Sequence, residues 1–240
     1  MRREAEGEKD REKGVELRDR TKDLQVFDLG RVPYEKAWKY QKELVENRRR
    51  GEIEDTLVFA EHPPVLTLGR AWKRQNVLAG PGALEAHGVK VFLVERGGDV
   101  TFHGPGQIVG YPIVDLAQRG RDLHRYLRDL EDVLIQTVAL YGLEGGRKPG
   151  LTGVWVGEEK VCAFGVAVKS WVSYHGFALN VNTDLSYFSL INPCGIQDKG
   201  VTSLAKLLGH WVDPEEVKAK IAESFANVLG YSREEAAALA

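Results

Sequence analysis

Residues 160–204 read KVCAFGVAVKSWVSYHGFALNVNTDLSYFSLINPCGIQDKGVTSL, and this stretch decides the fold. It is apolar and rich in β-branched residues over 161–168, continues in the same way over 172–174, and alternates apolar with polar residues over 177–182. A period of two is typical of β-strands. The pattern breaks at 192–195, where proline and glycine on either side of Cys194 predict a turn.

Cys194 on this turn is the first candidate for chemistry. A thiol on a turn can be partly exposed and held by rigid neighbours, as an attacking group needs. Cys162, in contrast, lies within an apolar strand, where a cysteine ordinarily acts as a small buried hydrophobic residue. Lys160, at the start of that strand, is the amine that we expect to partner the thiol. The pattern alone leaves a catalytic and a structural role for Cys194 equally open.

The composition is that of a globular protein. The chain has 240 residues, of which 43% are hydrophobic and 28% are charged, and this length suits one domain or two small ones. A net charge of −2 gives no reason to expect nucleic acid as a partner. We expect a cytoplasmic protein that does not enter a membrane, because the sequence has two cysteines, no signal peptide and no apolar run of about 20 residues.

The organisation along the chain predicts one domain preceded by a tail. Residues 1–22 are almost wholly charged, so we expect a mobile or solvated tail, and 23–240 form the expected single catalytic domain. Strands are predicted over 24–29, 56–60, 65–68, 89–94 and 108–114, and helices over 33–51, 81–87, 123–141, 213–230 and from 232 onward. The absence of repeats and long linkers favours one α+β domain.

A glycine-rich stretch, residues 96–107, is the second region with chemical character. It reads RGGDVTFHGPGQ, in which Arg96 and His103 flank paired glycines that let a ligand approach the backbone closely. The glycines at 104, 106 and 110 superficially suggest a dinucleotide-binding loop. Their spacing is wrong for one, and the residues that follow look like a strand rather than a helix, so the stretch is not such a loop.

Two further patterns bear on function. The arginines of 48–50, followed by Gly51, are typical of a helix C-terminus, and nucleic-acid contact is the weaker interpretation. The six histidines form no helix-spaced pair with a glutamate and no cysteine quartet exists, so no metal site is expected. His103 and His175 each adjoin a glycine, which suits a site or a turn. The residues alone therefore leave a Cys–His protease and a Cys–Lys acyltransferase open.

Longer motifs give the chain a family resemblance. The segments EHPPVLTLGR, RGGDVTFHGPGQIVGYPIVDL, HGFALNVNTDL, INPCGI and VTSL follow one another between residues 61 and 204. In their order and spacing they resemble the lipoyl(octanoyl) transferase family, and the similarity spans roughly residues 24–210. The resemblance implies the α+β catalytic domain shared with biotin and lipoate protein ligases, with a mixed sheet and flanking helices.

The resemblance also implies an activity. The family moves octanoyl, or lipoyl, from acyl carrier protein to a lysine of lipoyl domains through a cysteine thioester, the first step of endogenous lipoylation. The acceptors would be 2-oxoacid dehydrogenase subunits and the glycine cleavage H protein. No cofactor is implied, because the octanoyl group arrives on the phosphopantetheine of the carrier. The alternatives are an ATP-dependent lipoate or biotin ligase of the same fold and an inactive module that binds lipoyl domains.

By resemblance, the catalytic residues are Cys194 and Lys160. The residues expected to bind substrate are Arg96, Gly97, Gly98, Asp99, Val100, Thr101, Phe102, His103, Ala163, Phe164, Gly165, Gly176, Phe177 and Ala178. The family usually has small aliphatic residues after its lysine, and Phe164 departs from that pattern, so it is expected to narrow the pocket. Cys162 shares strand parity with Lys160, which places a second thiol near the expected site.

The expected roles agree with thiol chemistry. A free cysteine has a pKa of about 8.5, and lowering this pKa by about 2 units raises the thiolate fraction roughly twenty-five-fold at neutral pH. A neighbouring lysine can lower the pKa in this way. We expect Lys160 also to pass a proton to the departing thiol and then to take one from the acceptor amine.

Overall fold

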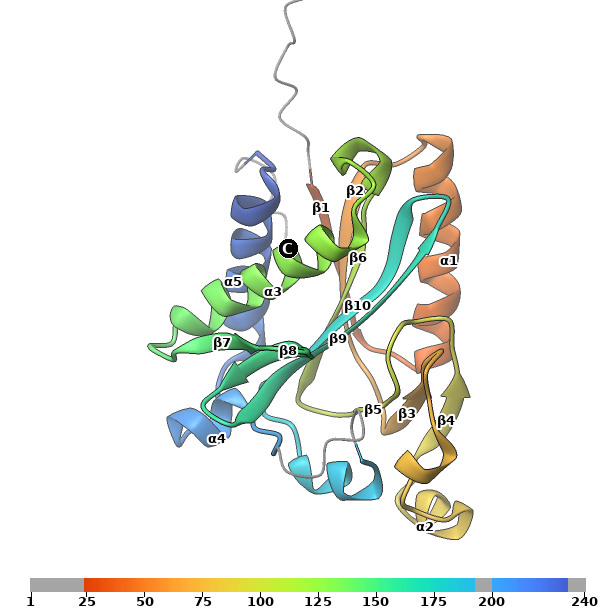
Figure 1. The fold of residues 1–240 in the computed structure, drawn as a ribbon, viewed down its shortest axis with the longest axis vertical. Helices are drawn as coiled ribbons and strands as arrows, with labels where there is room; N and C mark the ends of the chain where they lie inside the picture. Colours follow the sequence, from red (N-terminus) through yellow and green to blue (C-terminus); the bar gives the residue numbers. More distant parts are fainter. Residues whose placement is uncertain (1–23, 193–199, 233–240) are drawn as a thin grey trace, which may run out of the picture.

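The computed structural model describes residues 24–192 and 200–232, and within them a seven-stranded mixed sheet forms the centre of the fold (Figure 1). The strand order is β1-β2-β6-β10-β9-β8-β7, in which β1 runs parallel to β2 and the other neighbours are antiparallel. The strands are β1 (Leu24–Arg31), β2 (Asp55–Glu61), β6 (Gln107–Ile113), β7 (Gly145–Lys148), β8 (Leu151–Val156), β9 (Glu159–Lys169) and β10 (Val172–Asn180).

The stretch that decides the fold forms the β9–β10 hairpin. Its register runs from the Lys169–Val172 pair to the Cys162–Leu179 pair, so both predicted strands are confirmed. Every residue of β10 is buried, including the polar residues Ser173, His175 and Asn180. Because this strand lies between β9 and β6, the hairpin occupies the middle of the sheet.

A second, three-stranded sheet carries the glycine-rich stretch. Its order is β4-β3-β5, with β3 (Val65–Leu68) parallel to β4 (Lys90–Leu93) and antiparallel to β5 (Val100–His103). The sequence predicted β3 and β4 but not β5, because the glycines on both sides of that short strand conceal it. The backbone N–H of Gly97 donates to the carbonyl of Val166 in β9 at 3.0 Å, so the loop before β5 is fixed to the main sheet.

Helices cover both faces of the main sheet (Figure 1). On one face α1 (Tyr34–Arg50) packs over an apolar cluster that includes Ala37, Val58 and Tyr174. The other face bears α3 (Leu123–Ala139) and α5 (Pro214–Leu229), which share the larger core. The short helices are α2 (Pro81–Ala86), α4 (Leu204–Leu208) and the 3-10 segments Arg74–Asn76, Leu116–Arg119 and Leu185–Leu190.

The helix ends agree with the sequence signals. Gly51 ends α1 in the left-handed region, and the Asp213 carboxylate accepts from the backbone N–H of Glu215 at the start of α5. The sequence did not predict that Arg48 forms a buried ion pair. Its Nε donates to Oδ1 of Asp55 in β2 at 2.8 Å, so this arginine connects α1 to the sheet.

Several predictions fall outside the described residues. The charged tail over 1–22, Cys194 and nearly all of the short helix expected from 232 are in that position. Within residues 24–192 and 200–232, β7 and β8 are strands that the sequence did not predict. In the same parts of the chain, no helix has both the length and the apolar character needed to cross a membrane.

Candidate active site

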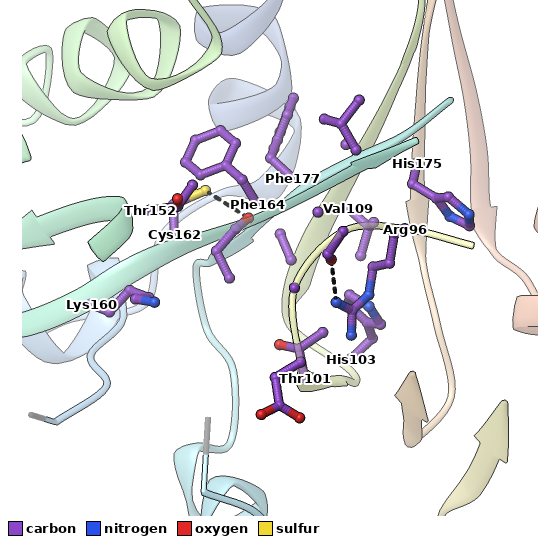
Figure 2. Close-up of a pocket in the computed structure, with 18 of the residues that line it drawn as sticks. Arg96, Thr101, His103, Val109, Thr152, Lys160, Cys162, Phe164, His175 and Phe177 are labelled. Atoms are coloured by element: carbon purple, nitrogen blue, oxygen red, sulfur yellow. Dashed lines mark hydrogen bonds between the residues drawn. The ribbon is translucent and has the colours of Figure 1, made fainter. Parts of the chain in front are cut away.

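A cavity of about 390 Å³ opens between the β9–β10 hairpin, β8 and the glycine-rich loop (Figure 2). It brings together nearly all the residues predicted from the sequence. The predicted substrate-binding residues that line it are Arg96, Gly97, Gly98, Asp99, Val100, Thr101, His103, Ala163, Phe164, Gly165, Gly176, Phe177 and Ala178. Phe102 does not line the cavity, because its ring stacks on Tyr187 with a centroid distance of 4.8 Å.

Lys160 lines the cavity from the start of β9 and is only 7% exposed. Its Nζ lies 4.8 Å from the ring centroid of Trp155, which is its cross-strand partner in β8. Its backbone N–H donates to the carbonyl of Gly200, and its carbonyl accepts from the N–H of Thr202, both at 2.9 Å. The backbone of Lys160 is therefore fixed on two sides.

The segment that contains Cys194, residues 193–199, lies outside the described residues, but both of its flanks are described. On one flank, the N–H of Asn192 donates to the carbonyl of Asn76 at 2.8 Å. On the other flank, Gly200 bonds to Lys160. Phe188 and Val201, which precede and follow the segment in the chain, both line the cavity.

Arg96 builds a wall of the cavity by binding other parts of the protein. Its Nε and Nη2 donate to the hydroxyl and the carbonyl of Thr67 at 3.0 and 2.5 Å, and its Nη1 donates to the carbonyl of Gly97 at 2.9 Å. The side chain also passes close to Gly165, where a Cβ atom would lie 2.7 Å from Cδ of Arg96. A glycine at 165 is therefore needed for this arrangement.

Asp99 holds the neighbouring loop. Its Oδ1 accepts from the backbone N–H groups of Lys73 and Val100 at 3.1 and 2.8 Å, and its Oδ2 accepts from the side-chain amide of Asn76. Since the carbonyl of Asn76 accepts from Asn192, Asp99 is connected through two hydrogen bonds to the residue two positions before Cys194. Asp99 lines the cavity, yet its carboxylate binds protein groups.

Cys162 lines the cavity but is fully buried. Burial raises the pKa of its thiol well above the usual range, so the thiol stays protonated at neutral pH and is a poor nucleophile. This agrees with the structural role expected from the sequence. Figure 2 shows Phe164 and Phe177 beside it, with ring centroids 6.3 Å apart, and they form part of the apolar lining.

Polar residues without charge form another part of the lining. Burial lowers the pKa of His103 to about 3 and that of His175 to about 4, so both rings are neutral at physiological pH. His103 bonds through Nδ1 to Oε1 of Gln107 at 2.8 Å, and Nδ1 of His175 lies 3.5 Å from the hydroxyl of Tyr34. The two histidines that the sequence could assign to a site or a turn therefore both lie at the cavity.

Other lining residues were missed from the sequence. Tyr34 comes from the first turn of α1, Leu123 and Leu127 come from α3, and Thr152 comes from β8. The two leucines carried only the signal of an amphipathic helix, which predicts burial but not a ligand. Among the described residues, no group of three or more histidine, cysteine, aspartate or glutamate side chains is placed to hold a metal ion.

Known proteins resemble this chain over most of its length. The family model for the lipoyl protein ligase A/B catalytic domain matches residues 33–226. An octanoyltransferase from Rubrobacter xylanophilus is 54% identical over 219 residues, which cover 90% of this chain and 98% of that protein. The chain belongs to the octanoyltransferase family. A second member, from Caldicellulosiruptor saccharolyticus, is 52% identical over 209 residues, which cover 86% of this chain and 89% of that relative.

Solved structures confirm the fold of this octanoyltransferase. A bipartite lipoate protein ligase from Thermoplasma acidophilum superposes with a TM-score of 0.68 over 88% of this chain and 85% of the ligase, at 16% sequence identity. At this low sequence identity, the superposition shows a common α+β fold and does not show a common activity. The family predicted from the motifs, the mixed-sheet fold and the octanoyltransferase activity are therefore confirmed.

Proposed function

We propose that this octanoyltransferase moves an octanoyl group from acyl carrier protein to a lysine of a lipoyl domain through a thioester on Cys194, with Lys160 as the proton carrier. The observation that carries this proposal is the position of Lys160. Its side chain is buried at the cavity, and its backbone bonds to Gly200 and Thr202, directly after the segment that contains Cys194.

The reaction proceeds in two balanced steps. In the first, the Cys194 thiolate attacks the thioester carbonyl of the donor, a new carbon–sulfur bond forms, and the phosphopantetheine thiolate leaves and takes a proton from Lys160. In the second, the neutral amine of the acceptor lysine attacks the Cys194 thioester, gives a proton to Lys160 and becomes an amide, while the Cys194 thiolate is released. Thioester exchange is nearly balanced in free energy and amide formation is downhill, so no nucleotide is needed.

The cavity supports an uncharged acyl chain as the ligand. Its volume of about 390 Å³ is within the range of small-molecule pockets, and Phe164, Phe177 and Leu127 supply apolar contacts. Each methylene group that leaves water for such a lining contributes about 0.8 kcal/mol. Because His103 and His175 are neutral, they do not add charge to the part of the lining that they form.

The proposed partners follow from this chemistry. Acyl carrier protein is the donor, and lipoyl domains of 2-oxoacid dehydrogenase subunits and the glycine cleavage H protein are the acceptors. A cytoplasmic location belongs to the same proposal, since donor and acceptors must be reached together.

An assay with two sets of substrates tests the proposal. In the first, the enzyme is mixed with octanoyl-acyl carrier protein and an unmodified lipoyl domain without nucleotide. In the second, it receives free octanoate, ATP, Mg²⁺ and the same domain. We expect the octanoyl mass to appear on the domain only in the first mixture. Modification only in the second would show a ligase, and modification in neither would contradict the proposed donor or acceptor.

A further inference from the structure

Glu131 is a carboxylate buried on the inner face of α3, where its exposure is 1%. Its Oε2 accepts from Nε of Arg147 at 2.7 Å and from Nη1 of Arg128 at 2.6 Å. Its Oε1 points the other way and accepts from the backbone N–H of Gly153 in β8 at 3.1 Å. A buried charge is unfavourable unless it is paired, so the arginines stabilise the carboxylate while Oε1 fixes a strand.

Gly153 is an irregular point of that strand. Its φ is +146°, and the register of β8 against β9 shifts between the next two residues, Val154 and Trp155. A Cβ atom at Gly153 would lie 3.0 Å from the carbonyl oxygen of Cys162, 3.0 Å from Cε of Lys160 and 3.2 Å from Cδ of Lys160. The Lys160 methylene groups and the Cys162 carbonyl therefore occupy the space that a side chain at 153 would need, and the backbone conformation itself favours glycine.

Two residues of β8 lie beside the Lys160 side chain. Gly153 leaves room for its methylene groups by lacking a Cβ atom, and the Trp155 ring lies 4.8 Å from its Nζ. Figure 2 shows the amine turned toward the side of the cavity where Thr101 and Arg96 lie. The segment 153–155 thus sets the direction of the Lys160 side chain, and the hydrogen bond from Gly153 to Glu131 sets the position of that segment.

We propose that Glu131 is a positioning residue for Lys160. By accepting from Gly153, it holds the irregular strand in the one position that leaves room for the Lys160 side chain and keeps its amine at the cavity. This inference rests on the proposed role of Lys160 in proton transfer. Glu131 itself acts through the strand and does not touch substrate.

Glu131 also has a stabilising role, and the variants must separate the two. Arg128 and Arg147 are 61% and 31% exposed, so their ion pairs with Glu131 contribute to stability at the surface end of the carboxylate. Glu131→Gln loses the charge for these arginines but keeps an oxygen that can accept from Gly153. Glu131→Leu loses both. Asp132→Asn is the matched control, because Asp132 is 46% exposed and pairs with Arg147 but not with Gly153.

The expected signature is a loss of kcat without a change in KM for the acyl donor. Displacement of a catalytic group by about 1 Å can lower the rate up to a hundredfold, and we expect kcat to fall by about 10- to 100-fold in Glu131→Leu. Glu131→Gln should recover most of this loss despite a lower melting temperature, and Asp132→Asn should keep the wild-type kcat.

A second pair of variants tests the same point from the strand. Gly153→Ala places a Cβ atom against Lys160 and the Cys162 carbonyl and should lower kcat in the same way. Gly157→Ala should not, because Gly157 also has a positive φ, +56°, but no atom lies within 4 Å of the added Cβ. In a Lys160→Met background, Gly153→Ala should cause a smaller fold-loss of kcat than in the wild-type background, because much of its effect acts through the Lys160 side chain. Circular dichroism and thermal unfolding show which variants fold. If Glu131→Leu does not fold, the kcat values of the two glycine variants test the inference.

The outcomes separate this inference from the proposed function. Wild-type kcat in Lys160→Met would overturn the proton-transfer role of Lys160 and the inference with it. A large loss in Lys160→Met, together with wild-type kcat in folded Glu131→Leu or Gly153→Ala, would overturn the inference alone. An equal fold-loss of kcat from Gly153→Ala in the Lys160→Met and wild-type backgrounds would also overturn it, because the strand would then act independently of the lysine.

Discussion

Nζ of Lys160 in β9 lies 4.8 Å from the centre of the ring of Trp155, its cross-strand partner in β8. Trp155 is 3% exposed and Lys160 is 7% exposed, so both side chains are largely removed from solvent. A cation over an indole face in such surroundings is stabilised by up to about 2 kcal/mol. The ring therefore limits where the amine can be.

Replacing Trp155 tests this relationship. In Trp155→Leu the aromatic face is lost, so we expect kcat to fall several-fold and the free energy of unfolding to drop by about 3 kcal/mol, as for other buried aromatic side chains. Trp155→Phe keeps a ring and should retain more activity than the leucine variant at a similar loss of stability. Steady-state kinetics and urea unfolding measure the two effects. Equal kcat values for the two variants would show that the aromatic face does not matter.

Lys160→Arg separates charge from proton transfer. Guanidinium keeps the positive charge but does not release its proton at neutral pH. If Lys160 carries protons, transfer to the acceptor amine should fall by about 10²-fold or more. The rate of cysteine alkylation at several pH values shows whether a reactive thiolate survives in this variant. Near wild-type transfer would leave Lys160 with an electrostatic role only.

Phe164 is expected to limit the length of the acyl chain. Its ring lines the cavity 6.3 Å from that of Phe177, and Phe164→Ala would enlarge the space on this side. We expect kcat/KM for decanoyl relative to octanoyl donors to rise about 10-fold, the scale of one or two methylene groups in an apolar pocket. Phe27→Ala, at an exposed position in β1, is the control. An unchanged ratio in folded Phe164→Ala would show that the chain does not reach this ring.

The buried histidines make stability depend on pH. Burial lowers the pKa of His103 to about 3 and that of His175 to about 4, whereas an unfolded chain binds a proton at about 6.5. The unfolded state therefore binds more protons below pH 6.5, so stability is lost as pH falls from there toward 4, by up to about 1.4 kcal/mol per pH unit for each histidine. Urea unfolding at pH 7, 6 and 5 measures the slope, which should be smaller in His103→Gln. An unchanged slope would contradict the assignment.

Some elements could be predicted from sequence because their signals are local. The β9–β10 hairpin follows from β-branched residues and alternation, and α5 follows from its Asp213 cap and from Gly230. These features depend on neighbours within a few residues along the chain. The family motifs supplied the glycine-rich loop and Lys160 as parts of one site, and nearly all of these residues meet at one cavity.

Other features depend on contacts that sequence does not record. The short strand β5 and the irregular β8 both contain or adjoin glycines, which weaken a strand pattern. Glu131 and Gly153 are 22 positions apart and meet only when α3 packs over β8. Helical spacing from Leu127 and Leu134 places Glu131 on the apolar face of α3, but nothing in the local sequence indicates that it binds Gly153.

We propose that Cys194 carries the acyl group, and the mass of the acylated enzyme shows whether it does. The enzyme is incubated with octanoyl-acyl carrier protein without an acceptor, and its peptides are analysed by mass spectrometry before and after hydroxylamine treatment. We predict an octanoyl mass on the peptide that contains Cys194. Hydroxylamine should remove this mass in one sample, and an added lipoyl domain should take up the octanoyl group in another. An adduct on Cys162, or an enzyme that transfers octanoyl with no adduct on either cysteine, would contradict the account.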